Sequence, residues 1–262
     1  MRTGSRWARL LGVEETIVDG VAVDEEEEAI VASVKPHQRQ RNRCGRCGER
    51  SGRYDAGEGR RRRRALDLGT IPASLEAEAP RVNCGEHGVV VAGVPWARHD
   101  ARFTKSFDDQ TAWLTTHSAK STVSSLMRGV WRRVGGIISR VAAEAETLMD
   151  RFAGLREIGI DEIRDRKGQN YLTVVVGHKR RRLVWAAPGR DTKTLSKFFE
   201  RLGGGGARAS NALGLSNALV ESTNTTIRLL MRQAFGFRDP AALIGLALVS
   251  LGGLCPPPPS RP

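Results

Sequence analysis

The chain has 262 residues, of which 40% are apolar and 27% charged, so global disorder is excluded and a sizeable core is expected. Lys and Arg total 42 against 29 Asp and Glu, giving a formal net charge of +13. This excess favours an anionic polymer as partner and counts against an enzyme that acts only on acidic small molecules. The preference for arginine over lysine fits phosphate recognition and equally fits a GC-rich coding bias.

The chain shows no targeting or membrane segment. Its first residues lack the apolar core of a signal peptide. The longest apolar run, Ala241–Leu254, is interrupted by glycines and is too short to span a bilayer. Four cysteines are too few for a disulfide scaffold, and intracellular proteins more often use such residues to bind a metal. We therefore expect a soluble intracellular protein.

Two β-rich runs, Thr16–Val23 and Ala29–Val34, flank an acidic loop near the N-terminus. This pattern is typical of a β-hairpin. A basic, irregular stretch, 36–43, then separates the hairpin from the first cysteines.

Two pairs of potential metal ligands occur at one spacing, Cys44 with Cys47 and Cys84 with His87. Glycines beside the cysteines permit the tight turn that points both sulfurs at one ion. Three thiolates and one imidazole would complete a closed, tetrahedral shell, which predicts structural zinc. The alternative is a set of reduced cysteines with an exposed histidine. Cys255 stands alone and is assigned no role.

The segment between the two ligand pairs suits a zinc ribbon, with strands expected at Arg64–Leu68 and Arg81–Asn83. It also contains a block of five consecutive arginines. The like charges of such a block repel one another and favour binding to phosphate groups. A solvent-exposed loop would have the same composition. The candidate DNA contacts here are Arg60, Arg61, Arg62, Arg63 and Arg64.

From Thr104 the pattern becomes helical. We expect helices at Phe107–Thr116, Lys120–Met127 and Trp131–Val141, with Ser106 as the N-cap of the first. Helix, short helix, glycine-containing turn and helix is the layout of a helix-turn-helix unit. The alternative is a three-helix connector with surface arginines. The candidate DNA contacts of the third helix are Arg132, Arg133 and Arg140.

The next region is rich in strands, expected at Glu157–Glu162, Asn170–Val176 and Leu183–Ala187. A helix follows and ends at Leu202. A three-stranded meander and a helix, with Asp161 on the first strand, is how a ribonuclease-H-like nuclease core begins.

Four glycines, 203–206, end that helix, and residues 207–215 show no clear pattern. A further helix is expected from about Asn217, and a buried helix at Ala241–Leu251. The polar stripe of the first of these two helices consists of Glu221, Asn224 and Arg228.

Taken together, these features resemble insertion-sequence transposases of the IS-L-three type. The resemblance covers nearly the whole chain. It rests on the paired knuckles, the helix-turn-helix and five short motifs, which are Val94–His99, Ile158–Glu162, Tyr171–Val176, Pro188–Arg190 and Ser216–Asn224. It implies cutting and joining of DNA at the ends of the element. It also implies an Asp-Asp-Glu carboxylate set that holds two magnesium or manganese ions.

Asp161 matches the first carboxylate of this set and Glu221 the last. The middle Asp should lie on a fourth strand after the first core helix, but no acidic residue occurs between Glu200 and Glu221. Neither Asp165 nor Asp191 is placed to substitute easily. We infer an internal deletion in this interval.

Two consequences follow from the inferred deletion. Magnesium or manganese should bind poorly, because two carboxylates cannot position both ions. The fourth strand normally pairs beside the first, so its loss should leave Ile158–Asp161 as an open sheet edge and a hazard for association.

The expected fold is therefore α+β and multidomain: a β-rich zinc-ribbon-like module, a helix-turn-helix and a truncated ribonuclease-H-like α/β core. The predicted segments are the hairpin and zinc module at 1–99, the helix-turn-helix at 100–152, the first half of the core at 153–202, the junction at 203–216, the last core helices at 217–254 and a proline-rich tail at 255–262.

The leading hypothesis is a transposase-family protein that recognises double-stranded DNA at the terminal inverted repeats of its element and is impaired in strand cleavage. The second is a non-catalytic zinc and helix-turn-helix repressor or inhibitor of transposition. A basic RNA-associated protein is the third, disfavoured because aromatic residues make up 5% of the chain and no stacking motif is present. The expected location is the cytoplasm, with the nucleoid. A homo-oligomer, or a hetero-oligomer with an intact transposase, is the expected assembly.

Overall fold

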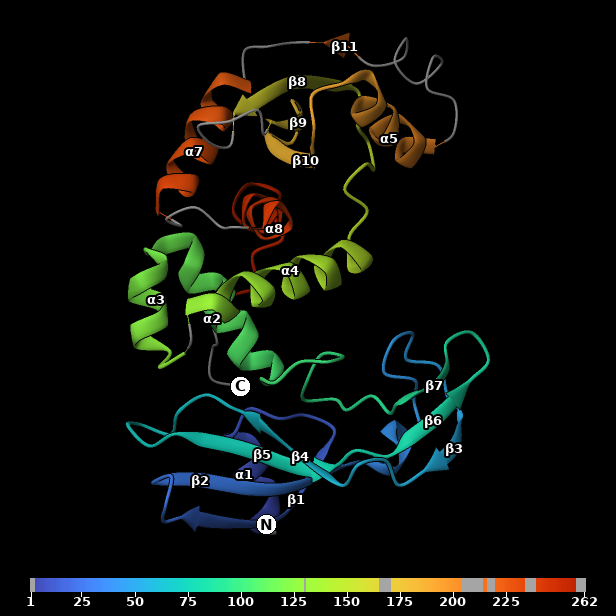
Figure 1. Cartoon of the computed structure of the whole chain (residues 1–262), viewed down its shortest axis with the longest axis vertical. Helices are drawn as coiled ribbons and strands as arrows, with labels where there is room; N and C mark the ends of the chain where they lie inside the picture. Colours follow the sequence, from blue (N-terminus) through green and yellow to red (C-terminus); the bar gives the residue numbers. More distant parts are fainter. Residues whose placement is uncertain are drawn as a thin grey trace. The chain divides into compact units, whose positions relative to one another are not determined.

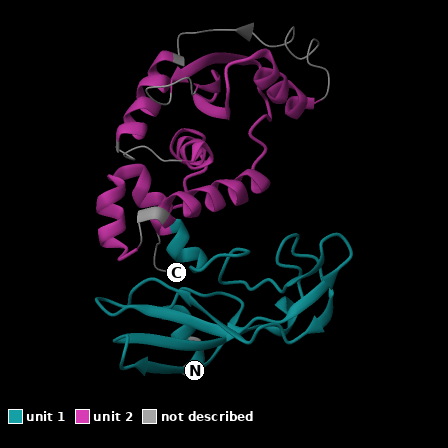
Figure 2. Cartoon of the chain, in the orientation of Figure 1, with its two compact units in different colours: residues 1–109, 259–262 teal, residues 110–258 magenta. Residues whose placement is uncertain are grey.

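The computed structural model describes residues 3–129, 131–164, 171–203, 214–215, 220–233 and 239–257. The chain divides into two compact units, one of residues 1–109 with 259–262 and one of residues 110–258 (Figure 2). Each unit has its own sheets and its own hydrophobic cores. The fold is α+β, as predicted.

The main sheet of unit 1 has the strand order β1–β2–β5–β4 (Figure 1). β1 (Thr16–Asp24) and β2 (Ala29–Pro36) pair antiparallel around the acidic turn, which confirms the predicted hairpin. β5 (Ala73–Glu78) joins β2 in parallel, and β4 (Arg60–Arg64) pairs antiparallel with β5.

β4 corrects the sequence prediction, which placed the arginine block in a loop or phosphate-seeking run and began a strand at Arg64. In the structure the block itself is the strand. Its register sets Arg62 opposite Glu76 and Arg63 opposite Leu75. Cross-strand pairing of opposite charges stabilises a sheet, and the partner strand β5 was itself not predicted. A run of like charges read alone could not reveal that partner.

The second sheet of unit 1 is small and antiparallel, with the order β3–β6–β7. It consists of β3 (Gly52–Asp55), β6 (Arg81–Cys84) and β7 (Gly88–Val91). β6 confirms the strand predicted there, whereas β3 and β7 were not predicted. A single 3₁₀ turn, η1 (Gln38–Gln40), precedes this sheet.

The core of unit 1 forms under its main sheet. Helix α1 (Thr3–Leu10), which was not predicted, packs against β1. Trp96, from the segment after β7, is 3% exposed and joins the same core. Apolar residues of the strands also belong to this core, including Ala32, Leu75 and Ala77. One face of this sheet therefore packs on the core, which is common for sheets built from antiparallel hairpins.

Three helices follow and confirm the predicted helical layout: α2 (Lys105–His117), α3 (Lys120–Leu126) and α4 (Trp131–Leu148). The N-cap of α2 was predicted wrongly. Thr104 Oγ1 accepts a hydrogen bond of 3.3 Å from the N–H of Phe107, and Ser106 lies inside the helix. The predicted apolar face of α4 is buried, comprising Val134, Ile137, Ile138 and Val141.

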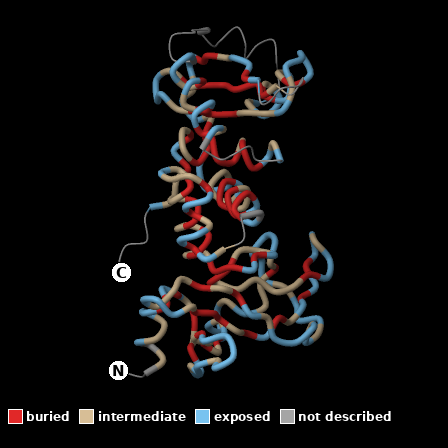
Figure 3. The backbone as a smooth tube through the Cα atoms, turned by 60° about the vertical axis from the view of Figure 1, so that its left-hand side comes forward, coloured by how far each residue is buried: buried red, intermediate tan, exposed pale blue. Residues whose placement is uncertain are grey.

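The sheet of unit 2 has the order β10–β9–β8–β11. β8 (Glu157–Arg164), β9 (Tyr171–Gly177) and β10 (Arg182–Pro188) form the predicted antiparallel meander. Buried residues, drawn red in Figure 3, are frequent along these strands because both faces of the sheet are covered.

One face of this sheet packs on α5 (Thr192–Gly203), whose Phe198 is fully buried. The opposite face packs on α7 (Val220–Gln233) and α8 (Pro240–Leu251) (Figure 1). Asp239 caps α8 by accepting a 2.9 Å hydrogen bond from the N–H of Ala241. No helix in the described ranges combines the length and apolarity needed to cross a bilayer.

The prediction of an open edge at Ile158–Asp161 is wrong at its first residue and stays a prediction for residues 159–161. β11 (Gly214–Leu215) pairs in parallel with β8, at Glu157 and Ile158. This short strand occupies the edge position expected of the fourth strand, within the interval where the sequence showed no pattern. The helix predicted to begin at about Asn217 is described from Val220 onward, so its first predicted residues lie outside the described ranges.

Candidate functional site

The four predicted metal ligands come together at the small sheet of unit 1. Cys44 and Cys47 lie at the turn before β3, Cys84 ends β6, and His87 is the last residue of the turn before β7. Their donor atoms all lie within 4.8 Å of one another. Cys44 and Cys84 are buried, and Cys47 is exposed. Two segments far apart in sequence thus supply one cluster.

The distances in this cluster fit a zinc ion. The sulfurs of Cys47 and Cys84 are 3.7 Å apart, and His87 Nδ1 is 3.7 Å from Cys84 Sγ and 3.9 Å from Cys44 Sγ. Zn–S bonds of about 2.3 Å in a tetrahedron place neighbouring sulfurs about 3.8 Å apart. Four protein donors leave no open position, so the residues fit a structural ion rather than a catalytic one.

The local backbone explains why glycines accompany the cysteines. Gly48 adopts a φ of +77°, which favours glycine, directly after Cys47. Gly45 has a different reason: a Cβ there would lie 2.6 Å from both Val91 O and His99 Nδ1. Gly48 is therefore needed for its positive φ, and Gly45 is needed because neighbouring atoms leave no room for a side chain.

Hydrogen bonds prepare one thiol of the cluster for metal binding. The backbone N–H of His87, and then its imidazole ring, lower the pKa of the Cys84 thiol to about 6. The thiolate is the form that binds metal, so this environment favours the ligand state near neutral pH.

Part of the arginine block is paired with carboxylates on the exposed surface of unit 1. Arg60 Nε lies 3.1 Å from Glu76 Oε2. Arg62 Nη1 lies 3.0 Å from Asp24 Oδ2 and 2.8 Å from Glu27 Oε2. Any phosphate that approached these two arginines would compete with these carboxylates for the same N–H groups.

The other arginines of the block differ from one another. Arg61 Nη2 lies 3.6 Å from Glu58 Oε2, and Arg64 forms an ion pair with Asp67. Arg63 is 7% exposed, and its Nε is buried without a hydrogen-bond partner. Burial lowers the pKa of Arg63, with a further contribution from the charge of Arg61. The block therefore does not act as one uniform, solvated cationic surface.

The predicted recognition helix is α4. Arg133 is exposed and Arg140 half-buried, and their spacing of two helical turns places both on one side of the helix. The side chain of Arg132 lies outside the described residues. α3 packs against α4, which is the contact that a helix-turn-helix requires.

Asp161 and Glu221 are positioned by neighbouring elements. Asp161 is exposed on β8, where its carboxylate accepts a 2.7 Å hydrogen bond from the N–H of Glu162. Its second oxygen accepts a hydrogen bond from Nδ2 of Asn224 on α7. Glu221 is exposed one turn before Asn224 on the same helix. Sequence reasoning placed Asn224 on the stripe of Glu221 but did not find its bond to Asp161.

The described residues do not complete the carboxylate set that a two-metal site needs. Within the described ranges, the zinc cluster is the one group of three or more close His, Cys, Asp or Glu donors. Asp191 is engaged elsewhere, since its Oδ1 accepts hydrogen bonds from the hydroxyl and the N–H of Thr194, which lower its pKa. Asp165 lies outside the described residues. The donors that the described residues supply therefore do not by themselves fit a pair of divalent ions.

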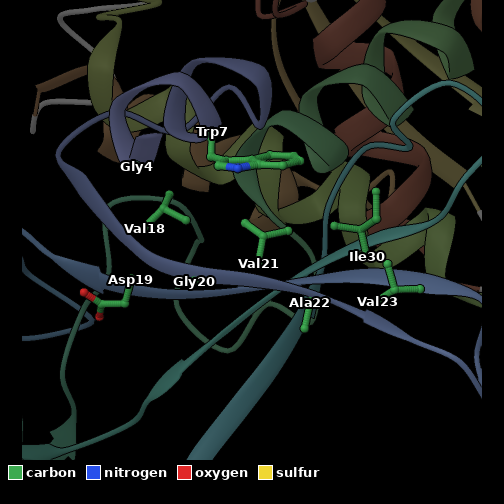
Figure 4. Close-up of a pocket in the computed structure, with 9 residues that line it drawn as sticks. All are labelled: Gly4, Trp7, Val18, Asp19, Gly20, Val21, Ala22, Val23 and Ile30. Carbon is green, nitrogen blue, oxygen red and sulfur yellow. The ribbon is translucent and has the colours of Figure 1, made fainter. Parts of the chain in front are cut away.

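An apolar pocket of about 420 Å³ lies between α1 and β1 in unit 1. Figure 4 shows the indole of Trp7 above Val21, with Gly4 and Gly20 also at the wall. The one ionisable residue of the lining, Asp19, is paired with Lys35 at 2.7 Å. The pocket therefore offers contact surface but no group suited to acid–base or metal chemistry.

Comparison with known sequence families divides the chain into three matched regions. Residues 40–87 match the zinc finger of the transposases of IS204, IS1001, IS1096 and IS1165. Residues 94–142 match the helix-turn-helix domain of transposase family ISL3. Residues 158–211 and 207–246 match the DDE transposase domain of ISL3 as two separate segments, which meet in the interval of the inferred deletion.

The curated relatives that the chain matches are also insertion-sequence transposases. The chain is 49% identical over 208 residues to the transposase for insertion sequence element IS1557 in two strains of Mycobacterium tuberculosis, covering 78% of this chain and 47% of the relative. It is 25% identical over 158 residues to the transposase for insertion sequence element IS1001 of Bordetella parapertussis, covering 58% of this chain and 38% of the relative. The chain thus spans about half or less of the length of these relatives. No solved structure matches it.

Proposed function

This chain belongs to the ISL3 family of insertion-sequence transposases, and we propose that it binds double-stranded DNA at the terminal inverted repeats of its element while being impaired in strand cleavage. The observation that carries the proposal is the pair Asp161 and Glu221 without a middle carboxylate, beside an intact zinc cluster and three-helix region.

The DNA-binding part of the proposal is supported by the helices and by charge. The match to a helix-turn-helix domain covers α2, α3 and most of α4. Arg133 and Arg140 of α4, together with Arg132, are the proposed groove and phosphate contacts. The four arginines of β4 that pair with carboxylates are proposed as secondary contacts, which must exchange these partners for phosphate, whereas Arg63 is buried. The net charge of +13 supplies the long-range attraction.

The impairment is supported by the split match to the DDE domain and by the sequence between Glu200 and Glu221. We attribute both to an internal deletion that removed the middle Asp. Asp161 and Glu221 are the remaining members of the proposed catalytic set. With two carboxylates, magnesium or manganese would lack the ligands that hold two ions a few ångströms apart, so no cleavage step is assigned.

The remaining parts of the proposal concern the zinc ion, the cellular location and the oligomeric assembly. Zinc at the four-ligand cluster would hold the small sheet of unit 1 as a rigid base for DNA contacts. The cytoplasm, at the nucleoid, is the proposed location. Self-association, or association with an intact transposase, is the proposed assembly.

The proposal is tested with duplex DNA that carries the ends of the element. Footprinting should reveal protection of the inverted repeats, and incubation with magnesium or manganese should produce no nick. Asp161→Asn should then leave both results unchanged. Nicking by the wild-type protein that Asp161→Asn abolishes would overturn the impairment. Equal binding to unrelated duplexes would overturn end recognition, and preference for RNA would indicate the RNA-associated alternative.

A second function, repression or inhibition of transposition, follows from the same geometry. A protein that occupies the element ends without cutting them would block an intact relative. The discriminating assay adds this chain to an active transposase of the family and measures excision. Inhibition that disappears with Arg133→Gln would support a role through end occupancy.

A further inference from the structure

Three arginines of unit 2 lie close together at a place apart from Asp161, and two of them pair with the carboxylate of Glu146. Arg151 follows α4, Arg182 begins β10, and Arg201 lies in the last turn of α5. Glu146 Oε2, on α4, is 3.0 Å from Arg151 Nη2 and 3.6 Å from Arg201 Nη2. Arg182 Nη2 donates to the backbone carbonyl of Arg151 at 3.2 Å. Two of the three guanidinium groups thus share one carboxylate, and the third donates to the backbone of Arg151.

Two donors of this cluster have no acceptor. Arg151 is 4% exposed, and its Nη1 is buried without a hydrogen-bond partner. Arg182 Nε is likewise buried and unpartnered. A buried N–H of a charged group without an acceptor is costly, and most such groups in folded proteins are satisfied. Among the residues that the structure describes, these two donors therefore lack acceptors beside a local excess of positive charge.

Neighbouring charges reinforce the excess. Burial lowers the pKa of Arg151, and the charges of Arg201 and Arg182 lower it further against the effect of Glu146. Burial and the charge of Arg180 lower the pKa of Arg182, against Asp150. An anion at this place would stabilise the charged forms of both guanidinium groups.

We propose that Arg151, Arg182 and Arg201 form a binding site for a phosphodiester of the DNA backbone, resting on the DNA-binding function proposed above. Guanidinium groups present paired N–H donors that match phosphate oxygens. Arg201 is 57% exposed and supplies the accessible side of the site, whereas Arg151 and Arg182 supply the unpartnered donors.

The site is separate from the carboxylate pair. Arg182 pairs with Gly177 on β9, which in turn lies opposite Ile158 on β8. Asp161 is three residues further along β8, or about 10 Å at the usual rise of a strand. A contact here would position DNA on unit 2 without touching Asp161 or Glu221, so it does not depend on cleavage.

The test measures binding of the full chain to a labelled element-end duplex by fluorescence anisotropy at several salt concentrations. Arg201→Gln and Arg182→Gln should each weaken binding, by about tenfold for a lost charged hydrogen bond. They should also lower the slope of log affinity against log salt by up to about 0.9. Arg232→Gln, an exposed arginine on α7, is the matched control and should change neither quantity.

The outcomes separate the site from the general function. Wild-type affinity and salt slope in both variants, with the fold intact by circular dichroism, would overturn the site while leaving DNA binding in place. Failure of the wild-type protein to bind any duplex would overturn both proposals. Stabilisation of the wild type, but not Arg182→Gln, by inorganic phosphate together with unchanged duplex binding would assign the site to free phosphate and overturn the DNA assignment. Because Arg201 is exposed, its variant separates lost binding from misfolding.

Discussion

The side-chain amide of Asn224 donates a hydrogen bond to the carboxylate of Asp161, joining α7 to β8 across 63 residues of sequence. Asn224 is 2% exposed, whereas Asp161 is exposed. The bond therefore fixes the helix that carries Glu221 against the strand that carries Asp161. The two family-matched carboxylates are held on adjacent elements by a neutral amide rather than by a third carboxylate.

Removing this amide should destabilise unit 2. Asn224→Ala leaves the Asp161 carboxylate without one of its two donors, and a hydrogen bond to a charged group contributes about 1.5–3 kcal/mol. Chemical denaturation followed by circular dichroism should reveal a loss of this size. Thr225→Ala, on the exposed side of the same helix, is the control and should change stability little. Equal stability of both variants would contradict the role of the amide.

Zinc should be required for the small sheet of unit 1. Cys47→Ser removes an exposed ligand, so the expected loss is metal affinity rather than core packing. Metal analysis should give close to one zinc per wild-type chain and much less for the variant, with a lower melting temperature. Cys255→Ser, which leaves the cluster untouched, should retain full zinc. A chelator that leaves the circular dichroism of the wild type unchanged would argue against structural zinc.

The close approach at Gly45 predicts a selective glycine effect. Gly45→Ala would set a methyl group 2.6 Å from Val91 O and His99 Nδ1, and relieving such overpacking costs about 1–3 kcal/mol. Gly52→Ala is the matched control, because nothing lies within 4 Å of its Cβ position. Thermal melts and zinc retention should separate the two variants. Similar behaviour would mean that the knuckle tolerates a side chain at both glycines.

The arginines of α4 and β4 should contribute unequally to DNA binding. Arg133→Gln is expected to weaken duplex binding and to lower the salt slope by up to about 0.9, the value for one phosphate contact. Arg62→Gln should have a smaller effect, because Asp24 and Glu27 already hold that guanidinium. Anisotropy titrations over a salt series measure both. A larger effect from Arg62 would show that the block on β4 exchanges its carboxylates for phosphate.

Local sequence patterns predicted most elements because alternation and helical periodicity depend on near neighbours. The hairpin of β1 and β2, the helices α2 to α4 and the meander of β8 to β10 were found in this way. The zinc ligands were found because two equal spacings identify knuckle turns. Some errors were local, such as the missed α1 and the N-cap of α2, and others concern strands that form only against a partner strand. The strand at Arg60–Arg64 depends on β5, and the short β11 depends on β8.

The sequence by itself indicated most of the element types, the four candidate metal ligands and the family, since each is written in short motifs. Only the tertiary structure decided which charges are satisfied. Arg62 is paired with Glu27, 35 residues away in sequence. Arg151 and Arg182 lie close together, and each has a buried N–H group without a partner among the described residues. Strand register and helix packing set these neighbours through burial of apolar faces. A polar side chain therefore acquires its partner from the fold rather than from its position in the chain.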